Sequence, residues 1–182
     1  MRPKKPGRHF YRQGKTKVYL KPVDNTLAVR YRQRAKAQVR KALRSLGQVS
    51  EIKSQQLFIV ELSEGTKEQE ARARLQPLTE KGAIDSLAPL LRDEDSQLLQ
   101  VLTDEITVRF KPTIAAKERK QIEKKYGLTI VRKNEFVPNQ FVVKVPRPGG
   151  LDTLKVANEL DAADGVEFAA PNFVSEYRTL ML

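Results

Sequence analysis

The chain contains no cysteine, so disulfide bonds and thiolate metal sites are excluded, and the redox compartment is left open. Its only histidine is His9. Serine-type hydrolysis needs a base beside the hydroxyl, usually histidine, and zinc sites need several His or Cys ligands. The glycines at 149 and 150 also lack the frame of a phosphate-binding loop. We therefore expect no catalytic residue, no metal site and no cofactor.

Long apolar runs are missing as well. No stretch approaches the roughly 20 apolar residues that cross a membrane. The basic start, residues 1–17, has no apolar segment of the kind found in secretory signals. We expect a cytoplasmic location and no membrane partner.

Positive charge is plentiful, with a formal net charge of +12. Residues 1–21 hold eight of the basic residues and no acidic one, so most of the excess belongs to one terminal segment. We interpret residues 1–21 as a basic, flexible tail. Because most of the excess lies in this tail, a nucleic-acid partner is disfavoured.

After this tail the sequence carries a pattern that occurs twice. Residues 27–32 and 106–111 both alternate apolar and polar side chains, as half-buried strands do. A helix is predicted after each, and its inward residues are Val39, Leu43 and Leu46 in the first copy, and Ala115, Ile122 and Tyr126 in the second. Each helix is expected to end at a left-handed glycine, Gly47 or Gly127.

The second half of each copy also repeats. Apolar strands are predicted at 57–62 and 141–145, with partner strands at 49–53 and 129–133. The next helix of the first copy is expected to start at Thr66, with Gln69 completing a capping box, and to fray at Pro77. Asp152 is expected to cap its counterpart. A glycine-initiated segment closes each copy, at 82–89 and 165–171.

These elements predict an α+β fold of two tandem ferredoxin-like (βαββαβ) open sandwiches, each an antiparallel sheet with two helices on one face. The other face of each sheet must be polar or covered by a partner. We expect a first domain at 22–91, a linker at 92–102, a second domain at 103–176 and a C-terminal tail at 177–182.

Four segments of the second copy resemble the amino-terminal propeptide of subtilisin-like serine proteases. They are DEITVRF (104–110), FVPNQFVVKV (136–145), VANEL (156–160) and GVEFAAPNF (165–173), in that family's order and spacing. They cover a little under half of the chain. The resemblance implies a non-catalytic protein that binds, inhibits or helps to fold a subtilisin-like protease.

The resemblance also implies which residues meet the protease. The segment after Pro171 would enter the substrate cleft as an added β-strand, with Thr179, Leu180, Met181 and Leu182 in the subsites and Leu182 innermost. The expected contacts from the sheet face and loops are Phe136, Pro138, Asn139, Glu167, Asn172, Phe173 and Glu176. Of these, Glu167 and Glu176 would cap the positive ends of enzyme helices.

The chain departs from that family in two respects. No catalytic domain follows in this sequence, so the protease would be met in trans, or in cis if this is a fragment. The unit also occurs twice, and its first copy has Gln55 and Gln56 where the second has Pro138 and Asn139. We expect the first copy to support the second. A non-catalytic assembly module and a basic nucleic-acid-binding protein are the alternative functions.

Overall fold

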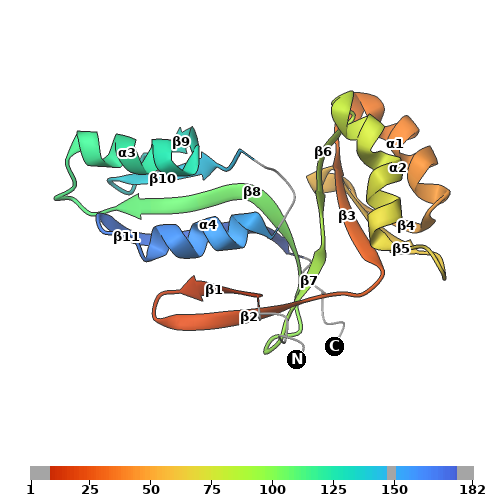
Figure 1. The fold of residues 1–182 in the computed structure, drawn as a ribbon, viewed down its shortest axis with the longest axis horizontal. Coiled ribbons are helices and arrows are strands. Elements are labelled where there is room, and N and C mark those ends of the chain that lie inside the picture. The colour runs from red at the N-terminus through yellow and green to blue at the C-terminus, as the bar shows by residue number, and fades with distance from the viewer. Residues whose placement is uncertain (1–8, 147–150, 176–182) are drawn as a thin grey trace, which may run out of the picture.

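The computed structural model describes residues 9–146 and 151–175. Within these residues the chain is an α+β protein with four α-helices and two antiparallel sheets, one of seven strands and one of four. The four-stranded sheet and two helices form one lobe, at the right of Figure 1, and the seven-stranded sheet curls through the remainder.

The first lobe comprises residues 26–88. Its elements are β3 (Thr26–Tyr31), α1 (Lys36–Arg44), β4 (Gly47–Ile52), β5 (Leu57–Leu62), α2 (Glu68–Glu80) and β6 (Ile84–Ala88). The strands lie side by side in the order β4-β5-β3-β6. Alternate residues of β3 point toward the two helices, because successive side chains of a strand face opposite sides.

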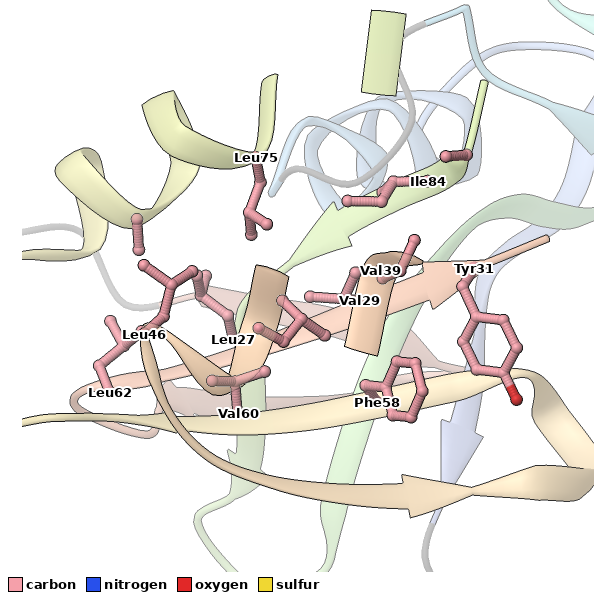
Figure 2. Packing of buried hydrophobic residues seen from close by; sticks show 13 residues of the cluster. Leu27, Val29, Tyr31, Val39, Leu46, Phe58, Val60, Leu62, Leu75 and Ile84 are labelled. Atoms are coloured by element: carbon pink, nitrogen blue, oxygen red, sulfur yellow. The ribbon is translucent and has the colours of Figure 1, made fainter. Parts of the chain in front are cut away.

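The core of the first lobe lies between its helices and its sheet (Figure 2). Val39 and Leu43 of α1 are buried there, as predicted, whereas Leu46 is buried but follows the helix, which ends at Arg44. From the sheet, Tyr31 stacks on Phe58 with ring centroids 4.5 Å apart. The apolar residues of the helices and of the strands therefore form one packed layer.

A polar cluster closes one end of this core. The Glu51 carboxylate accepts a hydrogen bond from the Tyr31 hydroxyl at 2.6 Å and pairs with Lys36 and Arg40, each at 2.7 Å. The hydrogen bond from Lys36, followed by that from Tyr31, lowers the pKa of Glu51. Burial, followed by the hydrogen bond to Glu51, raises the pKa of Tyr31 to about 12. Each shift favours the charge state that the cluster requires.

The second lobe comprises residues 99–175. Its elements are β8 (Leu99–Phe110), α3 (Ala116–Tyr126), β9 (Thr129–Lys133), β10 (Gln140–Lys144), α4 (Asp152–Asp161) and β11 (Val166–Ser175). β11 and β10 pair with opposite edges of β8, and β9 pairs with β10. Counted within each lobe, the strand order is the same as in the first: second, third, first, fourth.

Residues 9–22 form a hairpin, so the flexible tail expected over residues 1–21 is wrong for this part. The two strands are β1 (His9–Gln13) and β2 (Thr16–Pro22), and β2 pairs with β7 (Leu90–Asp93) in the seven-stranded sheet. β1 lies along α4, where Asn158 donates a hydrogen bond to the Phe10 carbonyl at 2.8 Å. Residues 1–8 lie outside the described residues.

An apolar cluster fixes the hairpin to the second lobe. Its members are Leu20, Leu91, Leu102 and Leu154, with Tyr11, Leu151 and Phe173 packed around them. This cluster explains the incorrect expectation, because the basic side chains of the segment mark only its solvent side, and Leu20 is 2% exposed.

The linker expected at 92–102 is not a separate segment. β7 ends at Asp93, a tight turn follows, and β8 starts at Leu99 and continues unbroken to Phe110. The Asp93 carboxylate accepts the backbone N–H groups of Asp95 and Ser96, each at 2.9 Å. A polar composition here indicates a turn between two paired strands.

The seam between the lobes is apolar. The first lobe contributes the face of its sheet opposite the helices, and β7, β8 and β11 contribute the rest. Its buried members are Ala28, Leu57, Ala88, Leu90 and Val101. The face that the sequence left without a cover is therefore covered, in the first lobe, by strands of the same chain.

Several predicted helix ends differ in the structure. Gly127 is left-handed with φ 62°, as expected. Gly47 instead opens β4, where a Cβ would collide with the backbone carbonyl oxygen of Glu61. The capping box at Thr66 is wrong, because α2 begins later without a side-chain cap, and Pro77 lies inside that helix. Asp152 is the first helical residue of α4 and makes no side-chain cap.

Candidate docking face

The second lobe has one sheet face turned away from its helices. Ile106, Val108 and Phe110 of β8 point into the lobe's core, so Thr107 and Arg109 between them point outward. We call the outward side chains the open face; they are Thr107, Arg109, Arg132, Gln140, Val142, Lys144, Glu167, Phe168, Ala170 and Asn172. All except Val142 are exposed or half-buried.

Asn172 is fixed at the centre of a polar network on this face. Its side-chain oxygen accepts a hydrogen bond from the Thr107 hydroxyl at 2.8 Å. Its backbone carbonyl accepts one from the Thr103 hydroxyl at 2.9 Å. Asn172 lies on the same side of β11 as Phe168 and Ala170, and the pairing of β11 with β8 is irregular beside it. The network holds this part of the face in one conformation.

Charged pairs also lie on or beside the open face. Glu167 lies 3.2 Å from Arg109, with 42% of its side chain exposed. Lys144 pairs with the nearly buried Asp104 at 2.6 Å. The carboxylates of Glu167 and Asp104 each have one basic partner within the chain, and that of Glu167 remains accessible to a further hydrogen-bond donor.

The loop between β9 and β10 presents Phe136 to solvent. The Asn134 side-chain oxygen accepts the backbone N–H groups of Phe136 and Val137 at 2.9 and 3.1 Å. Asn139 adopts a left-handed conformation with φ 59° and its carbonyl accepts the N–H of Phe110 at 3.0 Å. Phe136 is 92% exposed although its loop is hydrogen-bonded. A large apolar side chain on an ordered loop is typical of a contact residue.

A concavity of about 500 Å³ adjoins this loop. Its lining includes Phe136, Val142, Thr107 and Arg132. A second hollow, of about 400 Å³, lies where the open face meets the first lobe and includes Gln55, Gln56, Glu105 and Lys144 in its lining. The open face is thus bordered by a protruding aromatic residue at one end and by the first lobe at the other.

The site residues predicted from the sequence lie in different parts of the structure. Glu167 and Asn172 lie on the open face, and Phe136 lies in the loop beside it, with Pro138 and Asn139. Phe173 lies on the other side of the sheet, where its ring packs 5.0 Å from that of Tyr11. Glu176 and the tail residues Thr179, Leu180, Met181 and Leu182 lie outside the described residues.

The segment after Pro171 is not a free tail in its first residues. β11 continues to Ser175, and Phe173, Val174 and Ser175 pair with Leu102, Val101 and Gln100. The expectation of a tail from Pro171 onward is wrong for these positions, because the early part of β8 offers them a partner strand.

Of the ten open-face residues, the predicted contacts name only Glu167 and Asn172. The eight not named are Thr107, Arg109, Arg132, Gln140, Val142, Lys144, Phe168 and Ala170. The signal was present, because a strand with one buried face assigns every second residue to the other face. The irregular pairing at Val142 and near Phe168 does not show in the sequence.

Neither metal binding nor a membrane-spanning helix is indicated in the described part of the chain. No group of three or more His, Cys, Asp or Glu side chains there is placed to hold a metal ion. No helix there is long and apolar enough to cross a membrane. The arrangement offers surface for contact: a hydrogen-bonded polar centre, an exposed carboxylate and an exposed aromatic ring.

Comparison with known proteins identifies part of the chain. Residues 94–172 match the family model of the fervidolysin N-terminal prodomain. This region is therefore a subtilase prodomain-like domain, a domain type that is non-catalytic, and no catalytic family was found. A search of curated proteins gave no match. The matched region begins in the turn before β8 and ends within β11, so it covers the second lobe up to Asn172.

Proposed function

We propose that the second lobe binds a subtilisin-like serine protease through its open face, and thereby inhibits the enzyme or assists its folding. The observation that carries the proposal is the coincidence of the prodomain-like region with the lobe whose sheet face is open. A sheet face beside an ordered, exposed Phe136 suits a partner with a firm apolar surface. The partner is met in trans, or in cis where the protease belongs to the same chain.

The polar part of the face suits helix ends. Glu167 lies on the face with a partly exposed carboxylate, and a carboxylate is stabilised by the unpaired N–H groups at the start of a helix. The concentration of polar side chains around Asn172 favours a hydrated, specific contact over an obligate apolar one.

The residues after β11 complete the proposed inhibitor. An extended strand that leads directly into them suits β-augmentation, in which main-chain hydrogen bonds supply affinity and alternate side chains enter pockets. We assign Thr179, Leu180, Met181 and Leu182 to the substrate cleft, with Leu182 in the primary pocket. Inhibition then combines two linked contacts, the open face and the tail.

We further propose that the two lobes are duplicated ferredoxin-like units. They share a strand order, and matching positions make matching contacts. The carbonyls of Gln56 and Asn139, both left-handed, accept the N–H groups of Tyr31 and Phe110 at 2.9 and 3.0 Å. In both lobes an arginine nine positions after that aromatic residue lies over a phenylalanine ring.

The proposed function is tested by measuring the inhibition of a purified subtilisin-type protease. The full chain is compared with a chain that lacks residues 178–182. Sub-micromolar inhibition by the full chain, weakened about tenfold or more by the truncation, supports a tail in the cleft, since tenfold corresponds to about 1.4 kcal/mol. Digestion of both chains without inhibition would contradict action in trans on that enzyme.

Self-association is a second candidate function, favoured by one observation. β9 ends the order of the seven-stranded sheet, and its five residues are all exposed. Such an edge can pair with another strand. Light scattering separates the two functions, because a discrete dimer with no affinity for the protease fits only an assembly module.

A further inference from the structure

The end of β11 is held from both sides of the sheet. After the irregular pairing at Asn172, Phe173 packs with Tyr11 and the hairpin cluster, on the helix side. The next residue, Val174, points to the opposite side and packs in the seam between the lobes. Two successive side chains therefore fasten the strand where it leaves the prodomain-like region.

The first-lobe side of this seam is built for dry contact. Ala28 is 1% exposed, Leu57 2% and Ala88 1%, and all three project from the face opposite the helices. Small alanine side chains allow the two sheets to approach closely, and the larger leucine fills the remaining space. Val174 enters this layer as a partly buried member.

The corresponding positions of the second lobe are more polar. Register aligns Arg30 with Arg109, because these residues oppose Leu57 and Gln140 in their respective sheets. Leu57 thus corresponds to Gln140 on the open face, and Ala28 to Thr107. One copy of the face is apolar and covered by the chain's own strands, whereas the other is polar and open.

We propose that the first lobe is an intramolecular clamp that fixes the end of β11 and sets the direction in which the following residues leave the fold. Val174 is the positioning residue through which the clamp acts. The functional consequence rests on the proposed protease inhibition, whereas the clamping of the strand is a property of the chain alone. The first lobe then needs no protease contact of its own.

The clamp lowers the entropic cost of binding the protease. A tail that follows a free strand must order additional residues when it binds, and ordering a single residue costs on the order of tenfold in affinity. Holding Phe173, Val174 and Ser175 in advance removes that cost from the binding step. It also keeps the end of β11, from which the tail continues, in a fixed place relative to the open face, so that both proposed contacts can form together.

The test places a charge in the seam with Val174→Asp. The matched control is Ser175→Asp, which adds the same charge one residue closer to the tail, where the side chain points away from the seam. Val174→Ile keeps the apolar contact. We expect Val174→Asp to weaken inhibition of the subtilisin-type protease about tenfold or more, Val174→Ile to retain it, and Ser175→Asp to change it less than about threefold.

A positioning role is separated from a structural one by combining each variant with the removal of residues 178–182. If Val174 acts through the tail, Val174→Asp has no further effect on the truncated chain. An equal loss in full and truncated chains would instead show that the seam supports the open face, and would overturn the clamp. Unchanged inhibition by the full-length Val174→Asp chain would overturn it as well.

Failure of the proposed function is distinguishable from failure of the clamp. If the unaltered chain does not inhibit or bind the protease, the proposed function fails, and amide hydrogen exchange then decides the clamp. Val174→Asp must speed the exchange of the amides at residues 173–175 by about tenfold or more while the core of the first lobe stays protected. Unchanged exchange at these residues would overturn the inference.

Discussion

The substitution Leu20→Ala tests whether the hairpin is a structural part of the protein. Leu20 lies on β2 and is 2% exposed, in contact with the cluster that includes Leu91, Leu102 and Leu154. Removing three carbon atoms costs about 2.4 kcal/mol of transfer free energy, and an unfilled cavity adds to that loss. We expect the free energy of unfolding to fall by about 3 kcal/mol, which corresponds to a melting temperature lower by roughly 6 to 12 °C.

The assay is urea unfolding followed by circular dichroism, with Lys21→Ala as the control. Lys21 is exposed on the same strand, so its replacement should change the free energy of unfolding by less than about 0.5 kcal/mol. The slope of the free energy of unfolding against urea concentration should stay the same for both variants. If Leu20→Ala costs no more than Lys21→Ala, the hairpin does not pack as described and residues 9–22 behave as a tail.

Four further predictions concern two residues of the polar cluster, the exposed aromatic residue and the close strand contact. The pKa of Glu51 is lower in the folded protein, so its contribution to stability is present above its ordinary pKa and is lost as the pH falls through the folded value. Glu51→Gln should therefore reduce the fall of the melting temperature at acidic pH. The pKa of Tyr31 is raised to about 12, so its contribution to stability is lost as the pH rises toward that value. Tyr31→Phe should therefore remove this part of the fall in melting temperature at alkaline pH. Phe136→Ala should leave the melting temperature within about 1 °C but weaken protease inhibition by about 10-fold or more. Phe110→Ala, in the core, should lower the melting temperature, and an unchanged melting temperature in that variant would contradict the assignment of core and surface. Gly47→Ala should cost about 1–3 kcal/mol in urea unfolding, because a Cβ there meets backbone, and a neutral result would contradict the described pairing of β4 with β5.

Periodicity in the sequence was sufficient to predict most elements of the two lobes. β9 has the predicted bounds, and the inward helix residues Val39 and Leu43 lie in the core. These predictions succeeded because local burial patterns determine which face of an element is apolar. Where a contact joins distant segments, as between β1 and α4, no local pattern indicates it.

The candidate site was predictable only in part. Asn172 follows from strand alternation with Phe168 and Ala170 once β11 is recognised, whereas Glu167 lies on the same face only because the pairing is irregular between Val166 and Phe168. Phe173 also follows from alternation, because it lies on the same side of β11 as Ala169, and its assignment to the protease contact is what the sequence did not correct. The covering of the first lobe depends on tertiary packing, since Ala28 and Ala88 look the same in a covered and an uncovered strand.

The hydrogen bond between Asn158 and the Phe10 carbonyl joins residues 148 positions apart, and this separation has a consequence for synthesis on the ribosome. The first lobe can assemble its sheet while the rest of the chain is still being translated, because all its strand pairs lie within residues 26–88. The hairpin emerges before it, and β2 can pair with β7 early, yet β1 cannot meet α4 until that helix has been made. β1 is therefore translated before the first lobe but is among the last strands to reach its packing partner, and until then the Leu20 side of the hairpin lacks its contact with Leu154.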